Sequence, residues 1–266
     1  MDGDSTIKQK ARIKEKAPLT KNIYRITLET RLCSNAKPGQ FVMVYPPDGA
    51  MLLGRPVCIA DASDKMLSIV FRVIGSGTQA IASLDEGDFL EIEGPLGNGY
   101  PDDTDTMNAK EIVLLGGGLG APSLLFLARS LIAEGKKPTV ILGYRDSKTK
   151  LFLSEDFRIL GADTIIATED GSAGVCGNVL DALKNHKIDA GLIYACGPMP
   201  MLAAVKEYAF SHRIKAYISL EEHMACGVGV CLGCVVKTGK KDAHSNVCNA
   251  RVCTEGPVFE AQTVKI

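Results

Sequence analysis

The chain has 266 residues, near the size at which one hydrophobic core stops growing and chains divide into domains. Hydrophobic residues make up 46% and charged residues 23% of it, as in ordinary globular proteins, and the formal net charge of −1 gives no reason to expect nucleic acid or an anionic membrane as a partner. The 9 cysteines are an odd number, and the N-terminus lacks the basic start and apolar run of a secretory signal, so we expect a cytoplasmic protein whose cysteines bind metal rather than form disulfides.

Residues 1–102 have the pattern of an antiparallel β-barrel. Short runs of β-forming residues are separated by turn formers such as Lys37-Pro38-Gly39. In the last run Leu90 and Ile92 alternate with glutamates, which is typical of a half-buried strand. Strands are expected at Ala11–Lys16, Asn22–Glu29, Phe41–Tyr45, Val57–Ala60, Met66–Val73 and Phe89–Gly94. Short strands in such close succession predict a closed barrel.

Two places in this predicted barrel could bind phosphate. Arg55 stands at the start of a strand, in the run Arg55-Pro56-Val57-Cys58, where a guanidinium could grip a phosphate bidentately; a solvated surface arginine is the alternative. Gly75-Ser76-Gly77-Thr78 follows another strand and leads into a helical stretch, 79–84, whose free N–H groups would suit a pyrophosphate. An ordinary strand-to-helix turn is the alternative there, and neither place is decisive alone.

Residues 103–220 alternate between strand and helix patterns, after a polar linker at 101–108. This alternation predicts a parallel sheet with covered faces. Strands are expected at Ile112–Leu115, Thr139–Gly143, Thr164–Thr168, Leu192–Ala195 and Ala216–Ser219, and helices at Ser123–Ala133, Glu155–Leu160, Val179–His186 and Met201–His212. The uncharged stretch 112–128 is shorter than the roughly 20 residues of a membrane-spanning helix and is broken by glycines, so we expect no membrane partner.

The first strand of this second region runs into a glycine-rich turn. Gly116, Gly118 and Ala121 fit the dinucleotide-binding fingerprint, with Gly120 in the same turn. The fingerprint needs a strand before the turn and a helix after it, and both are predicted here. Small residues would let the backbone approach a pyrophosphate. A tight turn with no ligand is the alternative.

Two further places in the sequence concern which nucleotide binds and where its nicotinamide would lie. After the next strand, Arg145-Asp146 leaves NAD and NADP open, with a preference for NAD because an acidic residue suits a free ribose 2′-hydroxyl. Cys196 follows the fourth parallel strand, and ligands of open α/β sheets lie at the carboxyl ends of strands. A nicotinamide could therefore lie beside it. A buried strand-end cysteine without a function is about equally consistent with the pattern.

Residues 221–266 contain cysteines in the spacing of an iron–sulfur site. Cys226, Cys231 and Cys234 form the C-x4-C-x2-C pattern of plant-type two-iron, two-sulfur ferredoxins, and Cys248 and Cys253 follow. Glycines between them let the backbone wrap closely around a ligand. Zinc sites more often open with cysteines two to four residues apart, and buried free cysteines are a third alternative. We rank the two-iron cluster first and zinc second. A tail this short does not fold on its own core without help, and a metal is the usual help.

Together these motifs resemble the ferredoxin-reductase-like electron-transfer subunit of type B dihydroorotate dehydrogenase. The resemblance covers nearly the whole chain. The most specific runs are Arg55-Pro-Val-Cys58, Gly75-Ser-Gly-Thr78, Gly94-Pro-Leu-Gly-Asn-Gly99, Gly116-Gly-Gly-Leu-Gly120, Cys196-Gly-Pro-Met199, 224–234 and Cys253-Thr-Glu-Gly-Pro-Val-Phe259. The resemblance implies that the barrel binds FAD, the α/β domain binds NAD, and the tail holds one two-iron, two-sulfur cluster.

The same resemblance implies which residues bind these groups. The implied FAD contacts are Arg55, Pro56, Val57, Cys58, Val70, Phe71, Arg72, Gly77 and Thr78. The family's last cysteine precedes an acidic-Gly-Pro-Val-Phe run, which matches Cys253 and makes it the fourth cluster ligand, beside Cys226, Cys231 and Cys234. Cys248 is then a spare. Cys58 departs from the family, which usually has serine there, and this puts one hydrogen bond to the flavin in doubt.

The function that the resemblance implies is that of an oxidoreductase component in de novo pyrimidine biosynthesis. A partner subunit carrying FMN would oxidise dihydroorotate, and two copies of each subunit would form a heterotetramer. Electrons would pass singly through the cluster to FAD and leave as hydride to NAD. No residue of this chain is expected to act as acid or base. The alternatives are the same module serving another partner, such as ferredoxin or a sulfur- or hydrogen-metabolising complex, and a zinc-stapled nucleotide-binding sensor.

Overall fold

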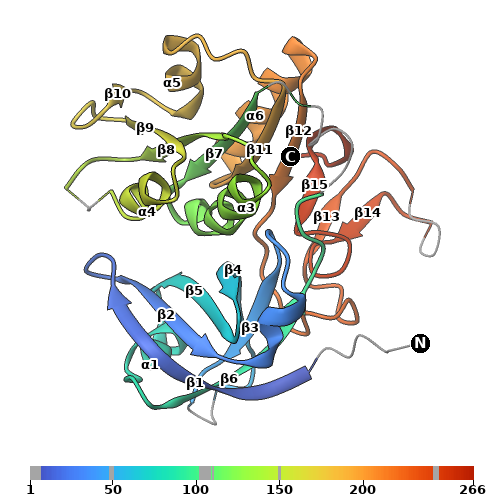
Figure 1. The fold of residues 1–266 in the computed structure, drawn as a ribbon. Helices are drawn as coiled ribbons and strands as arrows, with labels where there is room; N and C mark the ends of the chain where they lie inside the picture. The colour runs from blue at the N-terminus through green and yellow to red at the C-terminus, as the bar shows by residue number, and fades with distance from the viewer. Residues whose placement is uncertain (1–6, 48–50, 102–108, 110, 149–150, 242–245) are drawn as a thin grey trace.

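The computed structural model describes residues 7–47, 51–101, 109, 111–148, 151–241 and 246–266. Figure 1 shows three parts: a barrel at the bottom, an α/β domain at the top, and a C-terminal segment in red along one side of both. None of the described helices is long and apolar enough to cross a membrane. The predicted boundary between residues 102 and 103 lies outside the described residues, and the boundary between 220 and 221 stays a prediction.

The barrel is closed, with its antiparallel strands in the order β1-β2-β5-β4-β3-β6, which confirms the prediction. The strands are β1 (Ile7–Pro18), β2 (Ile23–Glu29), β3 (Phe41–Tyr45), β4 (Arg55–Ser63), β5 (Met66–Arg72) and β6 (Phe89–Leu96), with a 3-10 turn, η1 (Arg31–Asn35), and a short helix, α1 (Ser76–Ala82). Ile26, Ile59 and Ile69 fill the interior. Leu90 and Ile92 join them, as the alternation in β6 predicted.

The α/β domain contains a sheet in the order β10-β9-β8-β7-β11-β12-β15. Its parallel strands are β7 (Ile112–Gly117), β8 (Thr139–Tyr144), β9 (Asp163–Thr168), β10 (Val175–Cys176), β11 (Leu192–Cys196) and β12 (Lys215–Ser219). Its helices are α3 (Ala121–Ala133), which follows the 3-10 turn η2 (Gly118–Gly120), α4 (Ser154–Ile159), α5 (Val179–Asn185) and α6 (Met199–His212). All predicted strands and helices of this domain are present.

Both faces of this sheet are covered, because its side chains alternate between two apolar cores. Val113 and Leu115 of β7 pack with residues of α5 and α6 on one face. Ile112 and Leu114 of the same strand pack with residues of α3 and α4 on the other. Strands buried on both faces leave only their ends for a ligand, so the carboxyl ends of β7 and β11 are the places to examine.

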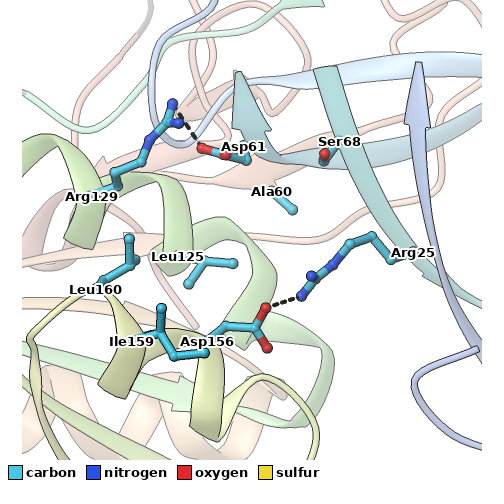
Figure 2. Close-up of a pocket in the computed structure, with 9 residues that line it drawn as sticks. All are labelled: Arg25, Ala60, Asp61, Ser68, Leu125, Arg129, Asp156, Ile159 and Leu160. Carbon is cyan, nitrogen blue, oxygen red and sulfur yellow. Dashed lines mark hydrogen bonds and ion pairs between the residues drawn. The ribbon is translucent and has the colours of Figure 1, made fainter. Parts of the chain in front are cut away.

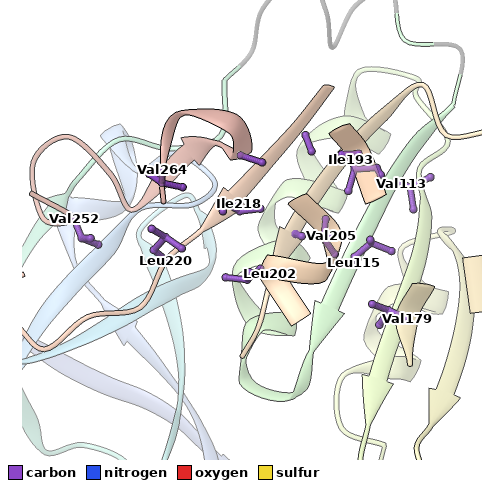
Figure 3. Close-up of a cluster of buried hydrophobic side chains, with 14 of the residues drawn as sticks. Val113, Leu115, Val179, Ile193, Leu202, Val205, Ile218, Leu220, Val252 and Val264 are labelled. Atoms are coloured by element: carbon purple, nitrogen blue, oxygen red, sulfur yellow. The ribbon is translucent and has the colours of Figure 1, made fainter. Parts of the chain in front are cut away.

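The C-terminal segment shares its core with the rest of the molecule. It contains the hairpin of β13 (Val235–Lys237) and β14 (Asn249–Arg251), then β15 (Val258–Glu260) and the 3-10 turn η3 (Ala261–Thr263). Val252 and Val264 of the segment lie in one apolar cluster with Ile218 of the sheet (Figure 3). Met43 and Leu96 of the barrel belong to the same cluster. The segment therefore rests on both domains.

Strand β15 was not predicted, and it ties the C-terminal segment to the α/β domain. It pairs antiparallel with β12, so that Ser219 lies opposite Val258, and forms one edge of the sheet. After it, the carbonyl of Val264 accepts a hydrogen bond from Nζ of Lys206 at 2.6 Å. Before it, Nδ2 of Asn98 in the barrel donates to the carbonyl of Thr254 at 3.1 Å. These contacts fix the part of the segment that follows its last cysteine, Cys253.

Candidate functional site

The four cysteines predicted to bind a cluster lie in two pairs. Sγ of Cys226 accepts a hydrogen bond from the N–H of Cys231 at 3.4 Å, and the two thiols also interact. Sγ of Cys234 accepts one from the N–H of Cys253 at 3.4 Å, and these thiols interact as well. Among the described residues, no three Cys, His, Asp or Glu side chains converge as they would on a single metal ion. The grouping is two by two.

The electrostatics of these thiols reflects their crowding. Burial raises the pKa of Cys253, and the neighbouring sulfurs of Cys234 and Cys226 raise it further, to about 12. Burial also acts to raise the pKa of Cys226, but backbone N–H groups, first that of Cys231, outweigh it and lower this pKa to about 6. A bound cation relieves the repulsion among crowded thiolates and keeps them deprotonated. The donor set therefore fits a metal cluster.

Residues 226–234, which we term the cysteine loop, have a backbone shaped by glycine. Gly227 and Gly229 have φ of +69° and +82°, in the left-handed region that favours glycine. A Cβ on Gly227 would also lie 2.9 Å from Cγ of Met43 in the barrel. Cys248 is exposed and lies opposite Thr238, at the end of the β13–β14 hairpin remote from Cys234, where its carbonyl accepts the Thr238 N–H at 2.9 Å.

Three of the predicted FAD contacts are brought together in the barrel. The guanidinium of Arg55, at the start of β4, lies over Gly77 of α1 so closely that a Cβ on Gly77 would overlap it. The hydroxyl of Thr78 accepts hydrogen bonds from the N–H groups of Ile74 and Gly75 at 3.0 and 3.2 Å and so fixes the turn before α1. A positive charge thus lies beside a helix start, an arrangement suited to a phosphate.

The other predicted FAD contacts differ in exposure. Val57, Val70 and Phe71 have buried side chains that serve the apolar cores, so a ligand beside them would meet mainly backbone. Pro56 is half-buried, and Arg72 is exposed at the end of β5. Strands β4 and β5 are neighbours in the barrel, so these residues lie on adjacent strands.

The predicted nucleotide residues also come together. Gly116 pairs with Cys196 in the register of β7 and β11. Gly120 packs against the backbone of Cys196 so closely that a Cβ would overlap its carbonyl. Gly118 has φ of +52°, with open space where its Cβ would be. Helix α3 begins at Ala121, so the turn presents a helix start at the carboxyl ends of two parallel strands.

The barrel and the α/β domain meet where Cys58 and Cys196 approach each other, and we term Cys58, Arg72, Cys196 and Glu221 the interdomain site. Burial raises the pKa of Cys58 well above its usual range, and the charges of Cys196 and Glu221 raise it further. Burial and then Glu221 raise the pKa of Cys196 to about 12. Both thiols therefore stay neutral at physiological pH.

Sequence reasoning missed Glu221. It stands two residues after the end of β12 and comes close to both thiols of the interdomain site. Burial raises its pKa, and the charge of Arg72 acts against this. Its position just beyond the carboxyl end of a parallel strand was the available signal. A carboxyl opposite an arginine can orient a polar group of a bound ligand.

Sequence reasoning also missed Tyr100, which lies close to both thiols of the interdomain site. Burial raises its pKa well above the usual range, so the hydroxyl stays protonated. This hydroxyl and Oγ of Ser123 share a hydrogen bond at 2.8 Å. The ring meets Tyr194 edge to face at 5.3 Å between centroids, and Tyr194 stacks on Tyr217 at 5.6 Å. The barrel's last residues are thereby anchored to the centre of the sheet.

Comparison with known protein families identifies the C-terminal segment. Residues 221–265 match the model described as the iron-sulfur cluster binding domain of dihydroorotate dehydrogenase B. Among solved structures, an NADH-dependent reduced ferredoxin-NADP oxidoreductase covers the whole chain with 25% identity and a TM-score of 0.83, over 91% of its own length. A ferredoxin NADP+ reductase from Neisseria gonorrhoeae, with FAD and NADP bound, shares the fold at a TM-score of 0.66, over 78% of this chain and 92% of that one.

Relatives of known sequence match over nearly the whole chain. The electron transfer subunit of dihydroorotate dehydrogenase B (NAD(+)) from Caldanaerobacter subterraneus is 37% identical over 257 residues, which is 97% of this chain and 98% of that one. The subunit of the same name from Geobacillus kaustophilus is 39% identical over 251 residues, 92% of this chain and 94% of that one. This chain belongs to the family of electron-transfer subunits of dihydroorotate dehydrogenase B.

Proposed function

We propose that this chain passes electrons from a dihydroorotate-oxidising FMN subunit, through a two-iron, two-sulfur cluster and FAD, to NAD. Membership of the family makes the chain a subunit of an oxidoreductase of pyrimidine biosynthesis. The observation that carries the finer proposal is the two-by-two grouping of the cysteines. In a two-iron cluster with four cysteines, each iron takes two of them.

The proposed cluster ligands are Cys226 and Cys231 for one iron and Cys234 and Cys253 for the other. Cys253 is preferred to Cys248 because it is buried beside Cys234 and interacts electrostatically with Cys226. The bound cluster would supply one-electron chemistry at this place. The chain's own contribution is the set of backbone N–H groups aimed at the Cys226 sulfur, which favour its thiolate.

The proposed FAD contacts belong to the barrel and the proposed NAD contacts to the α/β domain, and Cys58 of the first set approaches Cys196 of the second. Arg55, Gly77 and Thr78 would hold the FAD phosphates, with Arg72 and Cys58 nearer the ring. Gly116, Gly118 and Gly120 would hold the NAD pyrophosphate, with Cys196 beside the nicotinamide. A bound flavin would supply the exchange between single electrons and hydride. The neutral thiols and the buried tyrosine would keep water from the transferred hydride.

The cysteine loop is the proposed contact with the FMN subunit. Val228, Val230 and Leu232 are exposed on this loop, beside cysteines that a cluster would occupy. Exposed apolar side chains gathered at one place mark interaction surfaces. A partner seated there would bring its own cofactor near the cluster. The assembly of two copies of each subunit remains part of the proposal, as do the cytoplasmic compartment and the preference for NAD.

Anaerobic isolation of the chain from its own host, followed by addition of dihydroorotate, tests this function. We expect an FMN subunit to co-purify, dihydroorotate to bleach the flavin and cluster absorbance, and NAD to restore it. A sample that bleaches with NADH but not with dihydroorotate would favour the second candidate, the same module serving a different partner. The likeness to the NADH-dependent ferredoxin-NADP oxidoreductase supports that candidate. A colourless protein would leave only the zinc-stapled sensor.

A further inference from the structure

The barrel and the α/β domain are joined by an apolar seam along helix α3. Phe126 of α3 is buried among side chains of the barrel core. Ala60 and Val70 of the barrel are buried in turn among side chains of the α/β domain, with Leu124 and Leu125 of α3. Apolar contact is favourable but not directional, so such a seam holds two domains together without fixing one orientation.

Two ion pairs cross the same interface on either side of a cavity of about 200 Å³ (Figure 2). Arg25 of β2 reaches Asp156 in the first turn of α4, with Nη2 and Oδ1 2.5 Å apart. Arg129 of α3 reaches Asp61 of β4, with 2.8 Å between Nη2 and Oδ1. Leu125 lines the cavity between the pairs. Where the seam is incompletely packed, charge supplies the contact.

These pairs have a crossed arrangement of charge. The barrel contributes one arginine and one aspartate, and the α/β domain contributes the complementary aspartate and arginine. Their side chains are 25–33% exposed, so solvent screens them less than it screens fully exposed pairs. Burial raises the pKa of Asp61, and the charges of Arg129 and Arg25 act against this. Sliding the domains in either direction would separate both pairs at once.

The Arg129–Asp61 pair joins β4, the strand of the proposed flavin residues Arg55 and Cys58, to α3, the helix that follows the proposed nucleotide-binding turn. Asp61 lies three positions after Cys58 on β4. Arg129 lies on α3, which begins directly after the glycine turn that packs against Cys196. Its guanidinium also donates a hydrogen bond to the carbonyl of Ala62. The pair therefore links the strand of Cys58 to the helix that follows the turn beside Cys196.

We propose that Asp61, Arg129, Arg25 and Asp156 are positioning residues that set the spacing between the flavin face of the barrel and the nicotinamide face of the α/β domain. The proposal rests on the function proposed above. Hydride transfer falls steeply when the reacting atoms are displaced by about 1 Å. An interface that is free to slide would bind both cofactors and still transfer hydride slowly. Loss of the pairs is therefore expected to lower the rate rather than the occupancy.

The test uses the purified holoprotein, with FAD and cluster bound, and follows flavin reduction by NADH in anaerobic stopped-flow. For Arg129→Gln we expect the limiting rate to fall about tenfold, with the NADH concentration for half-maximal rate changed less than about twofold. The Asp61 oxygen lacks the alignment of a hydrogen bond with Arg129, so charge alone holds this contact. Arg129→Lys should accordingly stay within about threefold of the unmodified protein. Flavin content and flavin potential should not change.

Leu125→Ala is the matched control, because it shortens a side chain of the same cavity and leaves all four charges in place. If Leu125→Ala slows hydride transfer as much as Arg129→Gln, the ion pairs only contribute packing and the proposal is wrong. Equal slowing by Arg129→Lys and Arg129→Gln would also overturn it, since the charge would then not matter.

A second measurement separates this proposal from the proposed function. Spin labels on non-natural residues at Lys10 of the barrel and Lys137 of the α/β domain, both exposed, report the interdomain distance by pulsed EPR. We expect a broader distance distribution in Arg129→Gln than in the unmodified protein or Arg129→Lys. Identical distributions would overturn the positioning role. If NADH does not reduce the unmodified protein at all, the proposed function fails, and the distance distributions still decide whether the pairs fix the domains.

Discussion

The cysteine loop and the interdomain site would handle electrons in opposite surroundings. The loop has an irregular backbone with left-handed glycines, and it exposes Cys231 and the apolar Val230. The interdomain site is built on regular strands and the residues that follow them, and burial raises the pKa of both of its thiols. A group that exchanges single electrons with another protein needs to be near the surface. A hydride must be kept from water, which requires enclosure. The fold provides one surrounding for each task.

The interdomain site and the cysteine loop also differ in what stabilises their conformation. The interdomain site is built on two cores that need no ligand. The cysteine loop combines glycine-rich backbone with crowded thiols, and its shape depends on the metal that would bind them. Changes that remove the metal should therefore leave the interdomain site intact, and the reverse should also hold.

The largest effect is expected from Cys253→Ser. Loss of one proposed ligand should remove most of the iron and the cluster absorbance, while FAD stays bound and NADH still reduces it. Iron analysis and visible spectra make the measurement. Cys248→Ser, five positions away, is the control and should retain full iron content. Loss of iron in Cys248→Ser with retention in Cys253→Ser would reverse the ligand assignment.

Gly120→Ala should impair the nucleotide side of the interdomain site. The new Cβ would overlap the carbonyl of Cys196, and overpacking against backbone costs about 3 kcal/mol. We expect loss of NADH-dependent flavin reduction and a lower free energy of unfolding in denaturant, with the cluster absorbance retained. In Gly118→Ala the new Cβ would lie in open space, and only the left-handed φ would be strained. We expect this variant to lower the free energy of unfolding by about 1 kcal/mol. Equal costs for both variants would show that the close approach to Cys196 is unimportant.

Val230→Asp should affect only the contact of the cysteine loop with the partner subunit. Val230 is 79% exposed, so the new charge costs the isolated chain little. We expect the dissociation constant for the FMN subunit to rise about tenfold, with iron content and NADH reduction unchanged. Phe210→Asp on α6, where Phe210 is 68% exposed, is the control for a charge placed on an apolar surface side chain. Equal weakening by both variants would argue against the cysteine loop as the contact.

The smallest effect is expected from Cys196→Ala, and only in alkali. The folded state raises the pKa of Cys196 from 9.0 to about 12, so between these values the unfolded chain loses a proton that the folded chain keeps. Stability should therefore fall as the pH rises through this window, by at most about 1.4 kcal/mol per pH unit from this group. Denaturant unfolding at several pH values should give a shallower fall for Cys196→Ala. An unchanged slope would mean that the thiol is not protected by burial.

The strand and helix order followed from sequence because its signals are local. Alternation gave the barrel strands, and glycine turns between apolar runs gave the parallel sheet. Strand β1 begins before the predicted Ala11–Lys16 and ends after it. The prediction was too short because exposed lysines alternate along this strand and hide the pattern of its buried face. Strand β15 could not be predicted from Val258-Phe259-Glu260 alone, since three residues become a strand only by pairing with β12.

The residues of the candidate site also differ in whether a local sequence signal or only a long-range contact reveals them. The cysteine spacing and the glycine turns predicted most of its candidate residues, because each of these motifs lies within a short run of sequence. Glu221 looked like an ordinary surface acid, and only the fold brings it to Arg72 and the two thiols. The pair of Arg25 and Asp156 joins residues 131 positions apart, and no local pattern relates them. Contacts between domains are the part that the sequence alone conceals.

Strand β15 has a consequence for how the protein is made. During synthesis the barrel and the other strands of the sheet leave the ribosome before Val258–Glu260, so the edge of β12 stays unpaired until the residues beyond Cys253 have emerged. An unpaired edge is a template for association with other chains. Covering that edge and completing the set of thiols are therefore nearly simultaneous events at the end of translation, and a nascent chain that stalls between them is the form most exposed to aggregation.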